Sequence, residues 1–190
     1  MDKLFQKVLN KVKDASKIVV MGLGEEKLTD DGVGPYIISE LLYLSNQKFL
    51  FINAGIDPMA RIDEILDFKP SHLILVDTCT LKEEPGTISI LERQNLCNYV
   101  PISSHTIPVH IVIDLLVSKL QNLEVFMIGL VPKSLEGFTE LRQFKKDELS
   151  LEELNKNVNL PFFEIHLTET MKKSADMVIE MLKKVIESVQ

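Results

Sequence analysis

The sequence predicts an α/β fold: a three-layer sandwich in which a mostly parallel, twisted sheet of about five strands has helices on both faces. Apolar runs of strand length show no regular alternation with polar residues, which is typical of strands covered on both faces. Segments with apolar residues at helical spacing lie between these runs, and this alternation favours a parallel sheet. With 190 residues, the chain (1–190) is expected to form a single domain with a substantial core.

The first half of the chain contains three of the expected strands. An added N-terminal helix at about 1–14 has an amphipathic pattern, and the first strand (KIVVMGLG, 17–24) leads into a glycine-rich turn. A helix with an apolar face follows Gly34. The second strand is KFLFINAG (48–55), a short helix follows DPMA, and the third strand is HLILVDTC (72–79).

The second half begins with an expected edge strand. EEPGTISIL (83–91) predicts a turn and a strand that is antiparallel at an edge of the sheet. SSHTIP precedes a helix in which Pro108 suits the first turn, and VFMIGLV (125–131) is a further buried strand. Residues from about 140 to 165 are rich in Lys, Glu and Asn and indicate a surface excursion, and a long helix is expected from about 168 to 188.

Composition and charge exclude several classes of function. A formal net charge of −7 argues against nucleic acid as a partner, because phosphate binding needs clustered Lys and Arg. No apolar run approaches the roughly 20 residues that span a bilayer, so membrane insertion is not expected. Cys79 and Cys97 do not form a disulfide framework. The cysteine usage favours a reducing, cytoplasmic setting, and we expect the protein to act as a monomer.

Two acidic side chains and one histidine are the strongest candidates for a functional site. Asp31 follows the first strand, Asp77 ends an apolar strand, and His105 lies in a turn that enters a helix. If the second, first and third strands lie side by side in that order, Asp31 and Asp77 meet at the carboxyl edge of the sheet, where ligands bind in such folds. His105 then has to reach them from a longer connection.

The chemistry of this set allows two interpretations. Carboxylate oxygens with a neutral imidazole nitrogen suit a borderline divalent ion such as nickel, zinc or iron. Alternatively, two close carboxylates can share a proton and catalyse hydrolysis of a peptide bond. The segment GLGEEK has Lys27 where a dinucleotide-binding turn needs a third glycine, and Glu25 and Glu26 repel phosphate, so a nucleotide site is disfavoured.

Several neighbouring residues have simpler structural explanations. Asp30 is expected to cap the following helix or to interact with its dipole. Cys79 is expected to be a small buried core residue, and His72 lies at the far end of its strand, away from the site. The glycines of the acidic turn allow a tight backbone path.

Five segments in order resemble the hydrogenase maturation endopeptidases, in particular the type that processes the large subunit of hydrogenase 3 and related NiFe hydrogenases. The resemblance covers about 17–137. The segments are GLGEEKLTDDGVGPYI, NAGIDP, HLILVDTCTLKEEPGTISIL, SSHTIPVHIVIDLL and VFMIGLVPKSLEG.

The resemblance implies a one-domain endopeptidase that removes a short C-terminal extension from the nickel-loaded large-subunit precursor. The family's metal-binding side chains fall on Asp31, Asp77 and His105, with Asp31 and Asp77 also as the catalytic carboxylates of an aspartic-type peptidase. The cofactor implied is nickel carried by the precursor. The chain departs from the family at Glu25, where Asn is usual. It departs again at Ala54, Gly55 and Ile56, where Gly-Gly-Thr or Gly-Gly-Ser is frequent.

A second function is compatible with the same ligands. A non-catalytic nickel-sensing or nickel-carrier protein of hydrogenase assembly would hold the precursor without cutting it. Cleavage of the precursor, or binding without a change in its size, distinguishes the two.

Overall fold

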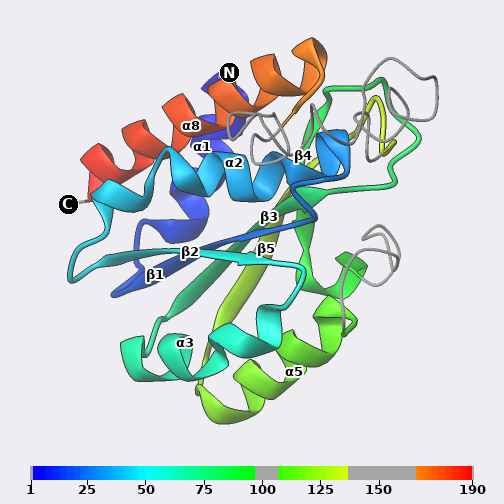
Figure 1. Cartoon of the computed structure of the whole chain (residues 1–190). Helices are drawn as coiled ribbons and strands as arrows, with labels where there is room; N and C mark the ends of the chain where they lie inside the picture. Colours follow the sequence, from blue (N-terminus) through cyan, green and yellow to red (C-terminus); the bar gives the residue numbers. More distant parts are fainter. Residues whose placement is uncertain (1, 97–106, 137–165, 190) are drawn as a thin grey trace, which may run out of the picture.

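The computed structural model describes residues 2–96, 107–136 and 166–189 and has the predicted three-layer α/β architecture (Figure 1). Within these residues, five strands form one sheet in the order β2-β1-β3-β5-β4. The strands are β1 (Ile18–Leu23), β2 (Phe49–Gly55), β3 (His72–Thr78), β4 (Ile88–Glu92) and β5 (Glu124–Leu130). Only the β4–β5 pair of this sheet is antiparallel, so the predicted antiparallel edge strand is confirmed.

Helices cover both faces of the sheet (Figure 1). On one face lie α1 (Asp2–Val12), α2 (Val33–Ser39) and α8 (Glu169–Val189), and on the other lie α3 (Ile62–Phe68) and α5 (Val109–Lys119). Short 3-10 turns connect them: η1 (Thr29–Gly32), η2 (Leu42–Leu44), η3 (Pro58–Arg61) and η4 (Arg93–Asn95). In the described part of the chain, no helix is long and apolar enough to cross a membrane.

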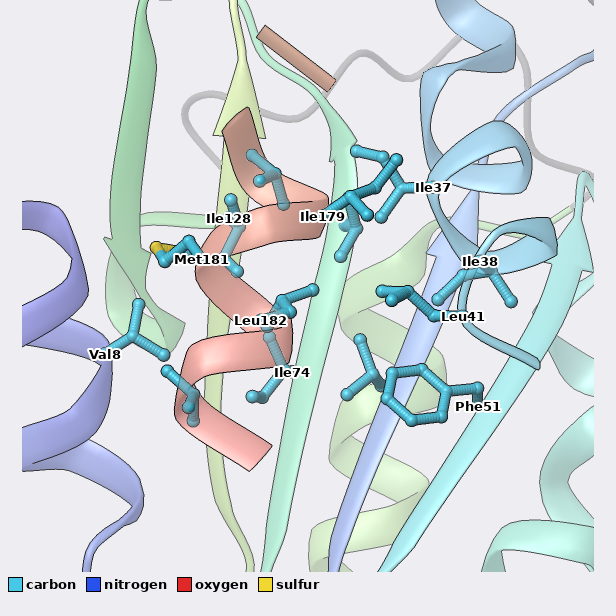
Figure 2. Close-up of a cluster of buried hydrophobic side chains, with 14 of the residues drawn as sticks. Val8, Ile37, Ile38, Leu41, Phe51, Ile74, Ile128, Ile179, Met181 and Leu182 are labelled. Carbon is cyan, nitrogen blue, oxygen red and sulfur yellow. The ribbon is translucent and has the colours of Figure 1, made fainter. Parts of the chain in front are cut away.

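The two helical layers explain why the central strands are apolar without interruption. Alternate residues of β1 point into opposite cores: Ile18 and Val20 pack toward α1, α2 and α8, whereas Val19 and Met21 pack toward α3 and α5. Figure 2 shows the first of these cores, with side chains from α2 and α8 meeting those of the sheet. Both faces of the central strands are therefore shielded from water. A polar side chain buried at the end of such a strand needs a hydrogen-bond partner within the protein.

The neighbouring strands β1 and β3 bring their carboxyl ends to the same edge of the sheet. They are parallel, with Gly22 opposite Val76. Gly34, in the first turn of α2, lies directly against these ends, because a Cβ there would stand 2.2 Å from the Leu23 carbonyl oxygen and 2.5 Å from that of Val76. Glycine is therefore needed for α2 to approach so closely, and the preceding η1 turn is held over the ends of both strands.

Candidate functional site

The first three strands of the sheet lie in the order that Asp31 and Asp77 need in order to be neighbours. β1 lies between β2 and β3, so the turn after β1 and the end of β3 are neighbours. Asp31 lies in the η1 turn after β1, and Asp77 is the last residue but one of β3. Both are almost completely buried, with exposed fractions of 3% for Asp31 and 1% for Asp77. Buried carboxylates of this kind are stable only when hydrogen bonds replace the lost water.

Thr78 contacts both carboxylates. Its hydroxyl donates to Asp31 Oδ1 at 3.0 Å, and its backbone N–H donates to Asp77 Oδ1 at 2.7 Å. The other oxygen of Asp31, Oδ2, accepts from the backbone N–H of Glu25 at 2.8 Å. The structure thus places Asp31 in contact with Thr78, the residue that follows Asp77, although 46 positions separate the two acids in the sequence.

Asp30 has a different set of partners, and the expectation that it caps the following helix is wrong. The helix α2 has no side-chain cap, and Asp30 points away toward two distant segments. Its Oδ2 accepts from the backbone N–H groups of Lys133 (2.8 Å) and Ser134 (3.1 Å). The Thr168 N–H donates to Oδ1 at 2.8 Å, and the Thr168 hydroxyl donates to Oδ2 at 3.1 Å. Asp30 therefore joins the turn after β1 to the loop after β5 and to the start of α8.

The backbone of the acidic turn is tightly constrained. Gly24 has a φ of 125°, and a Cβ there would stand 1.9 Å from the carbonyl oxygen of Asp31. Thr29 has a φ of 40°, which is strained for a β-branched residue. Its hydroxyl donates to the carbonyl of Glu136, and the N–H of Asp30 donates to that of Ser134 at 3.2 Å. Contacts with the loop after β5 thus hold the turn in the conformation that buries both aspartates.

The glutamates of the turn take up local roles. The side chain of Glu25 accepts from the N–H of Lys27, and that of Glu26 accepts from the amide of Asn53 on β2. The contribution of position 25 to the site is thus a backbone N–H, which any residue but proline supplies. The charged side chain of Glu25 folds back on its own turn.

The third predicted ligand, His105, lies outside the described residues. No group of three or more His, Cys, Asp or Glu side chains arranged for a metal ion occurs within 2–96, 107–136 and 166–189. Three other histidines, His72, His110 and His166, lie among the described residues, and His166 is exposed. His72 begins β3, at the opposite edge of the sheet as expected, and His110 lines an open cavity of about 430 Å³ with Arg93 and Asp114.

Cys79 follows the site residues on β3 and is a buried core residue, as predicted. Its side chain packs against β5, where a Cβ on Gly129 would stand 2.9 Å from the sulfur. Burial raises the pKa of the Cys79 thiol from 9.0 to about 11; the charge of Asp77 adds to the increase, and a hydrogen bond from the backbone of Leu81 opposes it. The thiol is therefore protonated at neutral pH and a poor nucleophile.

We expect two consequences of this environment. Cys79 should resist alkylation by iodoacetamide in the native protein and react once the protein is unfolded, as mapped by peptide mass spectrometry.

The thiol loses its proton near pH 9.0 in the unfolded protein and near pH 11 in the folded protein, so the unfolded state binds fewer protons between these values. The contribution of the Cys79 thiol to the free energy of unfolding therefore falls as pH rises from 9.0 to about 11. Cys79→Ala should lack this contribution in urea unfolding, and an unchanged pH dependence would contradict the assignment.

Thr78 and the partners of Asp30 were not identified from the sequence. A hydroxyl residue directly after the acid that ends a buried strand (VDT) is the signal that points to Thr78. The partners of Asp30 have no comparable signal, because Lys133 and Thr168 are more than 100 residues away and their backbone N–H groups carry no sequence information.

Comparison with known proteins places these observations in a family. The family model for hydrogenase maturation protease (HycI) matches residues 35–151, a range that contains Asp77 and His105 and begins just after Asp31. A putative hydrogenase maturation protease of Methanocaldococcus jannaschii is 30% identical over 137 residues, which cover 68% of this chain and 80% of that protein. The hydrogenase 3 maturation protease of Escherichia coli K12 is 25% identical over 129 residues, covering 68% of this chain and 81% of that protein.

Solved structures share the same architecture. The crystal structure of a NiFe hydrogenase maturation protease from Thermococcus kodakarensis superposes with a TM-score of 0.73 at 20% identity and covers 95% of this chain and 99% of that one. The hydrogenase maturating endopeptidase HybD of Escherichia coli has a TM-score of 0.65 at 21% identity, with 90% and 93% of the two chains covered. At these identities the likeness shows the fold, and it agrees with the predicted three-layer sandwich.

Proposed function

The chain belongs to the hydrogenase maturation protease family, and we propose that it is the endopeptidase that removes a short C-terminal extension from the nickel-loaded large-subunit precursor of a NiFe hydrogenase. The observation that supports this most strongly is the hydrogen bond between Asp31 and Thr78, the residue that follows Asp77. Two buried carboxylates, one in the turn after β1 and one at the end of β3, lie at the carboxyl edge of the parallel part of the sheet, which is where such folds bind their ligands.

The donor set fits the nickel of a precursor. Asp31 and Asp77 supply carboxylate oxygens, and His105 supplies an imidazole nitrogen, a combination that suits a borderline divalent ion better than calcium or a thiolate-bound centre. In this proposal the ion arrives with the substrate, and the three side chains contact it when the precursor docks. The place of His105 beside the two acids is part of the proposal.

Peptide-bond hydrolysis then requires a water molecule and a group that accepts its proton. We assign the acceptor to the Asp31 and Asp77 pair, which makes the enzyme an aspartic-type peptidase. As the water oxygen attacks the scissile carbonyl carbon, one carboxylate takes a proton from the water, and the proton passes to the nitrogen that leaves when the C–N bond breaks. The buried, hydrogen-bonded setting of both carboxylates keeps them in place without reorganisation.

The proposed partner is the precursor protein, met in the cytoplasm by a monomeric enzyme. The net charge of −7 disfavours nucleic acid as a competitor for the same surface. The reduced, buried thiol of Cys79 is compatible with a reducing compartment.

Nickel should license the reaction. We expect the chain to shorten the nickel-loaded large-subunit precursor of a NiFe hydrogenase from its source organism, and to act on the nickel-free precursor at least about 100-fold more slowly, since the metal contacts are then lost. Mass spectrometry of the precursor after timed incubation measures both rates. Cleavage of both forms at the same rate contradicts nickel-dependent recognition, and a stable complex in which the precursor keeps its full mass would favour a nickel-sensing binding protein.

A further inference from the structure

We propose that Thr78 is a positioning residue that holds the carboxylates of Asp31 and Asp77 in fixed relation to each other. The inference rests on the proposed function, because it assigns Thr78 to the two acids that the reaction uses. It starts from the observation that one residue donates to both, through its hydroxyl to Asp31 and through its backbone N–H to Asp77.

One of the two acids is part of the sheet, and the other lies in a turn outside it. Asp77 belongs to β3, a central strand paired with β1 and β5. Asp31 belongs to a turn, and its other carboxylate oxygen is bound within that same turn, by the N–H of Glu25. Among the described residues, the Thr78 hydroxyl is the side chain that links the Asp31 carboxylate to β3. Without it, the orientation of Asp31 relative to Asp77 depends on the turn alone.

Thr78 is well suited to this role because it cannot easily move. It is the last residue of β3, is completely buried, and stands opposite Leu130 of β5 in the parallel ladder. The N–H of the next residue, Cys79, donates to the Leu130 carbonyl at 2.9 Å, so the strand pairing continues past it. A β-branched side chain also has few rotamers, so the direction of its hydroxyl is set by the backbone.

The chemistry of the contact favours a functional purpose. A hydroxyl has one proton, and here it is directed to a carboxylate oxygen, which gives a charge-assisted hydrogen bond. Residues that orient functional ligands in this way typically affect binding or activity by about 10- to 100-fold when they are removed. A threonine that only filled space in the core would be replaced by valine, of the same shape, without such an effect.

Two pairs of variants separate the hydroxyl from the shape of the side chain. The first pair is wild type and Thr78→Val, which lacks the hydroxyl but keeps the shape of threonine. The second pair is Thr78→Ser, which keeps a hydroxyl, and Thr78→Ala, which lacks it. We expect Thr78→Val to cleave nickel-loaded precursor with kcat lowered about 10- to 100-fold and KM changed by less than about 3-fold, and Thr78→Ser to stay within about 3-fold of wild type. If Thr78→Val does not fold, the ratio of Thr78→Ser to Thr78→Ala gives the same comparison.

Crystal structures of the variants supply a readout that needs no precursor. We expect the Asp31 carboxylate to turn away from Asp77 in Thr78→Val and to keep its place in Thr78→Ser. Wild-type activity in Thr78→Val, an equal loss in Thr78→Ser, or an unmoved Asp31 in Thr78→Val would each overturn the proposal. If wild-type protein does not cleave the nickel-loaded precursor, the proposed function fails, and the position of Asp31 in these structures still decides the role of Thr78.

Discussion

Asp31→Asn and Asp77→Asn are each expected to remain folded and to lose roughly 1,000-fold in kcat/KM for cleavage of the nickel-loaded precursor. Asparagine keeps the shape of aspartate but removes the negative charge. The amide is a weaker metal ligand and cannot accept a proton from water. Because the two carboxylates act as a unit in this account, the double variant should be hardly slower than either single one.

The local contacts explain why these substitutions should be tolerated. At position 77, the amide oxygen of asparagine can still accept from the Thr78 N–H. At position 31, the amide oxygen can accept from the Glu25 N–H, while the amide nitrogen donates to the Thr78 hydroxyl, which is able to rotate and accept. Circular dichroism and thermal unfolding should therefore show little change.

A matched control comes from Asp63→Asn, which removes one negative charge from an exposed position in the first turn of α3. This variant should cleave at the wild-type rate, so a general effect of net charge can be distinguished from an effect at the site. Normal processing by both Asp31→Asn and Asp77→Asn would refute the assignment of these residues.

Asp30→Ala should lower the free energy of unfolding by at least about 3 kcal/mol, which is the largest stability effect that we expect from the acidic turn. The carboxylate accepts three backbone N–H groups and one hydroxyl, and it is completely buried. Removing it leaves these donors without their acceptor, and each partly buried donor costs roughly 1–3 kcal/mol. For a chain of this size the melting temperature should fall by roughly 10 °C.

Two variants provide the comparison for this prediction. Asp30→Asn keeps one acceptor oxygen but turns an amide N–H toward backbone donors, so its loss of stability should lie between those of wild type and Asp30→Ala. Asp31→Asn should unfold near the wild-type temperature. Differential scanning calorimetry measures all three, and an Asp30→Ala protein that melts within about 2 °C of wild type would show that the Asp30 contacts contribute little. We thus expect substitution of Asp30 to lower stability and substitution of the adjacent Asp31 to lower activity.

The fold could be predicted from the sequence because the central strands are covered on both faces. Continuous apolar runs identified β1, β2, β3 and β5, and the EEPGTISIL segment identified β4 as an antiparallel edge strand. The meeting of Asp31 with the end of β3 followed from the same reasoning once the order of the first three strands was assumed. Sheet topology therefore accounts for the position of the acids, because the carboxyl ends of parallel neighbours share an edge.

The partners of the acids could not be predicted in the same way. The adjacent Asp30 and Asp31 have different partners: Asp30 accepts from the loop after β5 and from Thr168 before α8, and Asp31 accepts from Thr78. This choice depends on the strained turn at Thr29 and on the close approach at Gly24, which are properties of the folded backbone. Sequence spacing gives two adjacent carboxylates but does not say which of them faces the strand ends.

The most direct test of the central claim is a crystal structure of the chain with added Ni²⁺, in which anomalous scattering locates the ion. We expect one ion bound at roughly 2.0–2.3 Å by a carboxylate oxygen of Asp31, a carboxylate oxygen of Asp77 and a ring nitrogen of His105. An ion held by other residues, or a His105 ring on the opposite rim of the molecule from the two acids, would contradict it.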